Sequence, residues 1–270
     1  MGIPKVVDTI LTEYINLFNK HFPGTIEGLY VHGSIALNAY VEDSSDIDFI
    51  TVTKRRFTEE DSKALTFIHT TIADKYQKPE MDGVYVLPED LGKLQNEDKY
   101  AYYNNGELRF GDYFNFNPIT WWVLKRNGIT ILGDELENFH FDVQPQQLSS
   151  YVLGNMNTYW TNRIKMAEAS MDQLVNLPSE KIDFEIEWTV LGLLRQLYTI
   201  KEYDVVSKLD AGEYGLTQSP VEWHNIIKEA INIRKGIKTE IFSTELEKLD
   251  QTIRFSKFLI KYCNNSLVKS

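Results

Sequence analysis

The 270-residue chain has ample apolar surface for a packed core, because 43% of its residues are hydrophobic and 13% are aromatic. Its 28 Lys and Arg against 39 Asp and Glu give a formal net charge of −11, which argues against a nucleic-acid substrate. The single cysteine, Cys263, excludes an internal disulfide, and no apolar run approaches the roughly 20 residues that span a bilayer. With no signal-peptide pattern either, we expect a cytoplasmic protein that does not act at a membrane.

The first predicted elements are a helix, a buried strand and a glycine corner. Apolar residues at helical spacing predict a helix over residues 6–22. The run Leu29–His32 is apolar, β-branched or aromatic and predicts a buried strand that Gly33 closes. Ser34 then opens a short helix, whose free backbone N–H groups and serine hydroxyl can hold a phosphate.

Two aspartates begin the next predicted strand. From Asp46 the apolar pattern changes to a period of two, so Asp46 and Asp48 point the same way while Ile47 and Phe49 supply buried sides. Two neighbouring carboxylates repel each other, and both ionise most readily when a divalent cation lies between them. Ligands that offer only oxygen favour magnesium.

A further carboxylate stands at the start of a third predicted strand. A helical stripe over residues 58–73 is followed by a short β-rich run over 82–87, which Pro88 stops. Asp82 begins this run, where its carboxylate can join the first two. Glu80 competes for the same role, because the sequence does not prove the phase of the strand.

The rest of the chain divides into a stretch with weak patterning and a helical second half. Residues 91–116 are polar and aromatic without clean periodicity and predict a loop or an extended ribbon. A helix over 120–124 and a short strand over 128–133 follow. Beyond about residue 147 the strand signals fade, and helical stripes cover 151–175, 183–203, 221–235 and 240–263. We therefore expect an α+β domain over 1–144 and an all-α helical bundle over 145–270.

Charged residues gather on one helix of the second half. Arg195 lies in an apolar helical stretch, where either a structural acid such as Glu187 or Glu185 or an anionic phosphate group must satisfy it. Asp183, Glu185 and Glu187 crowd the start of the same helix. Acids are favoured there by the helix dipole, and they would equally form an acidic wall for a polycationic ligand.

These motifs together resemble a known family. Gly33-Ser34 followed by Asp46-x-Asp48 resembles the signature of the nucleotidyltransferase superfamily. Residues 32–34 and 44–48 look most like the aminoglycoside adenylyltransferases of the streptomycin and spectinomycin type. Residues 188–198, with Arg195, and 207–214, with Lys208, resemble that family's C-terminal helix and the lysine loop that follows it. The resemblance extends from about residue 28 to about residue 230.

The resemblance implies a fold, a reaction and a set of site residues. The first domain would be a nucleotidyltransferase fold, with a mixed sheet and helices, and the active site would lie between it and the helical domain. The reaction would be Mg²⁺-dependent transfer of AMP from ATP to a hydroxyl group. Asp46, Asp48 and Asp82 would be the metal-binding and catalytic carboxylates, with Asp82 completing the metal site or accepting the hydroxyl proton. We favour Asp82 over Glu80 because it stands immediately before the apolar run, as in the family.

The same resemblance assigns the nucleotide and acceptor contacts. The residues that it implies for nucleotide binding are Gly33, Ser34, Ser45, Arg195 and Lys208. Glu185 and Glu187 would contact the acceptor, an aminoglycoside-type antibiotic, which gives the reaction a role in resistance. The tryptophan and aspartate of streptomycin-accepting members have no clear match in residues 171–182, which favours spectinomycin. The alternatives are transfer to another small molecule or to a protein, and a non-catalytic nucleotide-binding regulator.

Overall fold

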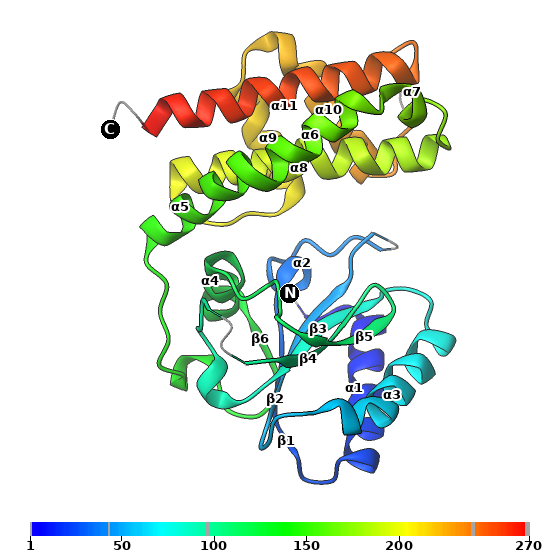
Figure 1. Ribbon diagram of the computed structural model, residues 1–270, viewed down its shortest axis with the longest axis vertical. Coiled ribbons are helices and arrows are strands. Elements are labelled where there is room, and N and C mark those ends of the chain that lie inside the picture. Colours follow the sequence, from blue (N-terminus) through cyan, green and yellow to red (C-terminus); the bar gives the residue numbers. More distant parts are fainter. Residues whose placement is uncertain (1, 43, 96–97, 239–240, 268–270) are drawn as a thin grey trace. The chain divides into compact units, whose positions relative to one another are not determined.

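The chain divides into two compact units. The computed structural model describes residues 2–42, 44–95, 98–238 and 241–267, and its units are Met1–Val143 and Gln144–Ser270 (Figure 1). The first unit holds a mixed sheet with helices, and the described part of the second holds helices alone, which confirms the α+β fold class. The division falls beside the boundary expected between 144 and 145. That each unit is an independent domain stays a prediction.

A six-stranded sheet forms the centre of the first unit, in the order β5-β4-β3-β2-β1-β6. The strands are β1 (Ile26–Val31), β2 (Ile47–Thr53), β3 (Met81–Val86), β4 (Tyr100–Asn104), β5 (Glu107–Gly111) and β6 (Ile129–Leu132). Strands β2 and β3 pair in parallel, whereas the other neighbours pair antiparallel. The parallel pairing places the starts of β2 and β3 side by side.

Two helices, α1 (Lys5–His21) and α3 (Ser62–Lys75), cover one face of this sheet (Figure 1). Their apolar side chains form a common core with Ile47 and Phe49 of β2 and Met81 of β3. Because side chains alternate along a strand, Asp48 and Asp82 project from the opposite face. The short helix α2 (Gly33–Ala36) contacts α4 (Pro118–Asn127), and short 3₁₀ turns occur at Glu59–Asp61, Pro88–Asp90 and Leu136–Asn138.

The weakly patterned stretch 91–116 contains a β-hairpin, so the extended-ribbon alternative is the one observed. Its two strands, β4 and β5, are joined by Asn105 and Gly106, whose φ angles of 50° and 76° are both positive. Two successive positive φ angles define a type I′ turn, the geometry that Asn-Gly favours and that matches the twist of paired strands. The turn places Asn104 at the end of β4, the strand beside β3.

The second unit is built around α8 (Ser179–Glu202), which packs against α5, α9, α10 and α11. Before α8, helix α5 (Pro145–Asn155) continues through a π-helical turn (Met156–Trp160) into α6 (Thr161–Ala169), and α7 (Met171–Leu174) follows. After α8 come α9 (Lys208–Gln218), a 3₁₀ turn (Val221–Trp223), α10 (His224–Arg234) and α11 (Glu245–Leu267). None of the helices described is long and apolar enough to cross a membrane.

Two expectations about this unit change with the structure. Lys208 begins a helix and does not lie in a loop, because the Ser207 hydroxyl caps α9 by accepting a hydrogen bond from the backbone N–H of Asp210 at 3.1 Å. The expected start of the last helix at Glu240 lies outside the described residues, and α11 begins at Glu245.

Candidate active site

The corner after β1 lies directly against the carboxylate of Asp48. Gly33 has a φ of +62°, and a Cβ atom built on it would lie 1.8 Å from Asp48 Oδ2. The backbone N–H of His32 also donates to the Asp48 carbonyl oxygen at 2.9 Å. Only glycine accommodates both this backbone conformation and this approach, so the residue fixes the distance between the corner and β2.

Asp48 and Asp82 are direct neighbours in the parallel pair β2–β3. The Asp82 Oδ2 atom accepts a hydrogen bond from Asn104 Nδ2 at 2.5 Å, whereas its Oδ1 atom is buried without a hydrogen-bond partner among the described residues. Burial, reinforced by the fields of Asp46 and Glu80, raises the pKa of Asp82 from 3.8 to about 6, although the Asn104 bond acts in the opposite direction. A proton or a cation bound at this carboxylate would therefore neutralise a charge that its buried environment disfavours.

The competing acid, Glu80, has a different environment. Its side chain is exposed, and its carboxylate forms an ion pair with Lys78 Nζ at 2.7 Å. Asp82 is therefore the acid that stands in register with Asp48. Asp46 comes immediately before β2 and is exposed.

The two serines expected to bind nucleotide differ in their contacts. The Ser34 hydroxyl is buried, and the described residues offer it no hydrogen-bond partner. The Ser45 hydroxyl is buried as well, but it accepts a hydrogen bond from the Val41 backbone N–H at 3.0 Å. Ser34 is thus available to an incoming ligand, while Ser45 also holds the loop before β2.

Two side chains beside the carboxylates were not singled out by the sequence. Asn104 donates to Asp82, and Tyr113 is fully buried close enough to Asp82 and Asp48 for their charges to act on it. Burial, with those two fields in addition, raises the pKa of the Tyr113 phenol. The Asn105-Gly106 pair was the signal for Asn104, because a hairpin turn there ends β4 at that residue.

In the second unit, cations from different helices meet at one buried acid. The Oε1 atom of Glu187, on α8, forms ion pairs with Lys208 Nζ at 2.9 Å and with Arg234 Nη1 at 3.5 Å. Arg195, further along α8, donates through Nε to the Val206 carbonyl oxygen at 3.0 Å. Burial lowers the pKa of Lys208, and the positive charges of Arg234 and Arg195 lower it further. The negative charge of Glu187 acts in the opposite direction and raises it.

Glu185 lies in a more open environment than Glu187. Its carboxylate pairs with Arg163, whose guanidinium lies 5.4 Å from the ring centroid of Trp188. The side chains of Glu185 and Arg163 are 35% and 31% exposed, against 8% for Glu187. Of the two acids expected to contact an acceptor, Glu185 is the accessible one, and both assignments stay predictions.

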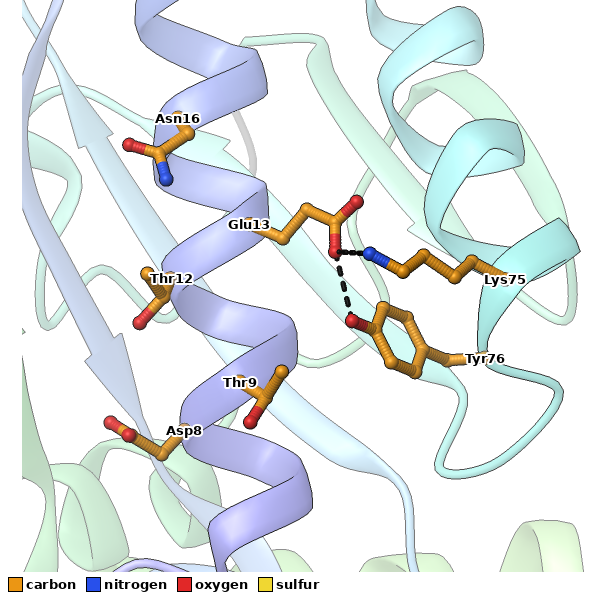
Figure 2. A pocket seen from close by; sticks show the side chains of 7 residues that line it. All are labelled: Asp8, Thr9, Thr12, Glu13, Asn16, Lys75 and Tyr76. Atoms are coloured by element: carbon orange, nitrogen blue, oxygen red, sulfur yellow. Dashed lines mark hydrogen bonds and ion pairs between the residues drawn. The ribbon is translucent and has the colours of Figure 1, made fainter.

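A polar pocket of about 420 Å³ lies elsewhere, on the outer side of α1 and α3. Figure 2 shows Glu13 of α1 reaching toward Lys75 and Tyr76, with Glu13 Oε2 2.6 Å from Lys75 Nζ and 2.9 Å from the Tyr76 hydroxyl. These helices cover the sheet face opposite Asp48 and Asp82, so this pocket is separate from the carboxylate pair.

Comparison with known families finds a match in each of the two units. The nucleotidyltransferase domain matches residues 11–102, and the C-terminal domain of aminoglycoside adenylyltransferases matches residues 161–258. The chain belongs to the aminoglycoside adenylyltransferase family. The first match contains the Gly33 corner and all three aspartates, and the second contains Arg195, Lys208 and Arg234, so this family member is a nucleotidyltransferase.

A solved structure shares the fold of this adenylyltransferase. It is the spectinomycin adenyltransferase AAD(9) from Enterococcus faecialis with ATP and spectinomycin, at a TM-score of 0.67 and 18% sequence identity. The similarity covers 94% of this chain and 98% of the other. No match was found among curated protein sequences.

The contact at Gly33 gives a first test of the site. We expect Gly33→Ala to lower the rate of nucleotidyl transfer by about 100-fold, because the new methyl group displaces the Asp48 carboxylate and misplacement by about 1 Å has this effect. Gly106→Ala is the matched control, since Gly106 also has a positive φ, +76°, but no atom lies within 4 Å of the added Cβ. Equal transfer rates in the two variants would rule out a role for the Gly33 approach.

Proposed function

We propose that this enzyme is a Mg²⁺-dependent adenylyltransferase that moves AMP from ATP to a hydroxyl group of an aminoglycoside-type antibiotic, with spectinomycin favoured over streptomycin. The observation that carries the proposal is the pairing of Asp48 with Asp82 in register, beside the Gly33 corner. A protein that only bound nucleotide would not need an acid with a raised pKa and an unpartnered oxygen at this position. Adenylylation of the drug would confer resistance.

The donor set suits magnesium. Asp46, Asp48 and Asp82 offer carboxylate oxygens, and Asp82 Oδ1 has no other hydrogen-bond partner in the described structure. Within the described ranges, no group of three or more His, Cys, Asp or Glu side chains is close enough to hold a metal ion as it stands. We assign Asp46 and Asp48 as the principal ligands and Asp82 as the third carboxylate. When bound, magnesium would neutralise charge on the ATP phosphates.

The phosphates of ATP would be held by backbone and side-chain donors. The Ser34 hydroxyl and the N–H groups of the Gly33 corner would bind the β- and γ-phosphates, with Ser45 supporting the same loop. Arg195 and Lys208 would bind nucleotide phosphates, consistent with their positive charge in a partly buried environment. These contacts would position ATP for the reaction. Positioning contributes most to the rate in reactions where the protein itself does little covalent chemistry.

The transfer step then needs one base. The acceptor hydroxyl oxygen attacks the α-phosphorus, the bond from that phosphorus to the bridging oxygen breaks, and pyrophosphate leaves. Asp82 would take the hydroxyl proton, a task suited to a carboxylate whose pKa is raised to about 6. Asn104 would keep its carboxylate in place through the bond to Oδ2.

The acceptor assignment rests on charge and on the structural neighbour. The net charge of −11 favours a cationic small molecule over nucleic acid, and Glu185 offers a partly exposed carboxylate for its amino groups. The neighbour's structure contains ATP and spectinomycin. A reaction that consumes ATP would take place in the cytoplasm.

The test is transfer of label from α-³²P-ATP with Mg²⁺ to a panel that includes spectinomycin, streptomycin and other hydroxylated aminoglycosides. We expect AMP-modified spectinomycin from the native chain and little modified streptomycin. Label that appears on protein, or on neither drug nor protein, would contradict the antibiotic assignment. Labelled streptomycin in preference to spectinomycin would leave the reaction in place and overturn the choice of acceptor.

A further inference from the structure

A chain of hydrogen bonds connects the β4–β5 turn to the third carboxylate. Asn105, the first residue of the turn, donates through Nδ2 to Asn104 Oδ1 at 2.8 Å. Asn104 in turn donates through Nδ2 to Asp82 Oδ2 at 2.5 Å. The chain of bonds therefore runs from an exposed turn residue, through the buried Asn104, to the half-buried Asp82.

The pairing of β3 with β4 brings the second bond about. The two strands are antiparallel with Gly83 opposite Tyr103, so the next step of the same register brings Asp82 opposite Asn104. Side chains of residues that face each other across two strands lie on the same side of the sheet. The Asn104 amide is therefore placed beside the Asp82 carboxylate by the backbone, while its orientation is left to its side-chain contacts.

The chemistry of an amide makes that orientation depend on Asn105. An ionised carboxylate only accepts hydrogen bonds, so Asn104 has to turn its Nδ2 atom toward Asp82. Its Oδ1 atom then faces the turn, where Asn105 supplies an N–H donor. An Asn104 amide rotated by 180° would present its oxygen to the carboxylate and its N–H groups to those of Asn105. The bond from Asn105 thus favours the one orientation in which Asn104 can hold Asp82.

Only one oxygen of the Asp82 carboxylate is used by this chain of bonds. Oδ2 accepts the bond from Asn104, whereas the described residues offer the buried Oδ1 no partner. With Oδ2 held, the carboxylate does not rotate freely about its Cβ–Cγ bond, so Oδ1 keeps one direction. A group that is already oriented before the reaction contributes more to the rate than one that must be oriented in each turnover.

We propose that Asn105 is a positioning residue for nucleotidyl transfer, which acts through Asn104 to direct Oδ1 of Asp82 toward the acceptor hydroxyl. This inference rests on the proposed function, in which Asp82 takes the proton of that hydroxyl. Turn geometry alone would account for an asparagine here, since Asn-Gly is favoured in the type I′ turn. Glycine is equally suited to that position, so Asn105→Gly keeps the turn and removes only the amide.

The first test is a double-mutant cycle on AMP transfer to spectinomycin. We expect Asn104→Ala to lower kcat about 30-fold and Asn105→Gly about fivefold, with KM for ATP within about twofold in both. Because Asn105 acts through Asn104, Asn105→Gly should change kcat by less than about twofold in the Asn104→Ala background. Gly106→Ala is the control, since it strains the same turn at a φ of +76° and leaves both amides in place. It should keep the native kcat.

A second test needs no turnover. In the metal-free protein, NMR measures how fast the Asn104 side-chain amide protons exchange with solvent, which the bond to Asp82 slows. We expect Asn105→Gly to speed this exchange about fivefold, and Gly106→Ala to leave it unchanged. Should Asn104→Ala not fold, the kcat and the exchange rate of Asn105→Gly decide.

The outcomes separate this inference from the proposed function. Native kcat in the folded Asn105→Gly variant, or an equal loss of kcat in both backgrounds, would overturn the role of Asn105 and leave the adenylyltransferase assignment intact. A loss of kcat in Gly106→Ala as large as in Asn105→Gly would show that only the shape of the turn matters. A native chain that transfers AMP to no compound of the antibiotic panel would overturn both proposals.

Discussion

Asp48→Asn should lower the rate of AMP transfer at least about 1,000-fold while leaving the protein folded. Asp48 lies against the Gly33 corner and in register with Asp82, so its negative charge is placed where a bound magnesium ion and the ATP phosphates would meet. The amide has the same shape but lacks that charge, so it coordinates Mg²⁺ much more weakly. Initial rates with labelled ATP, together with Mg²⁺ titrations, measure the loss.

The matched control for this prediction is Asp74→Asn. Asp74 is an exposed residue of α3, one of the two helices that cover the opposite face of the sheet, and its substitution changes the net charge by the same amount. We expect its transfer rate to stay within about twofold of the native rate. If the Asp48→Asn variant is folded and as active as this control, Asp48 is not a ligand of the metal.

Asp82→Asn should stabilise the metal-free protein although it abolishes transfer. The folded state raises the pKa of Asp82 to about 6, above its ordinary value of 3.8, so the folded protein binds the proton more tightly than the unfolded chain does. Stability from this group is therefore complete below about pH 4 and is lost as the pH rises through about 6. Asparagine does not ionise, so the variant avoids this loss.

Denaturation by urea in the presence of EDTA at pH 5 and pH 7.5 measures the effect. We expect the gain in the free energy of unfolding to be larger at pH 7.5 than at pH 5 by on the order of 1 kcal/mol. Asp74→Asn should show no such dependence on pH. If the Asp82→Asn variant is equally destabilised at both pH values, Asp82 stabilises the fold. That result would contradict the view that the folded protein keeps an ionised Asp82 at a cost in stability for the sake of function.

The sequence predicted the parts of the fold that depend on local pattern. The buried run before Gly33 and the period of two after Asp46 indicated β1 and β2 because burial on one or both faces dictates those patterns. For the residues of the hairpin β4–β5 the sequence predicts either a loop or an extended ribbon, since its aromatic and polar residues follow no clean period. The stronger signal there was the Asn105-Gly106 turn, and turn chemistry identifies a hairpin where periodicity does not.

The candidate site was predictable only where its residues come from neighbouring segments. The sequence places Asp82 at the start of a strand and the family resemblance favours it over Glu80, whereas the parallel pairing that sets Asp48 beside Asp82 is visible only in the structure. The neighbours of Glu187 could not be foreseen, because Lys208 and Arg234 reach it from different helices. Contacts of that kind depend on how helices pack, which no local pattern in the sequence encodes.

The most direct measurement is the position of a metal ion in crystals of the full chain grown with Mn²⁺ and a non-hydrolysable ATP analogue. Anomalous scattering should place manganese about 2.1 Å from carboxylate oxygens of Asp46 and Asp48, with the Asp82 carboxylate facing the same site. Manganese bound together with the analogue but remote from these aspartates would contradict the account.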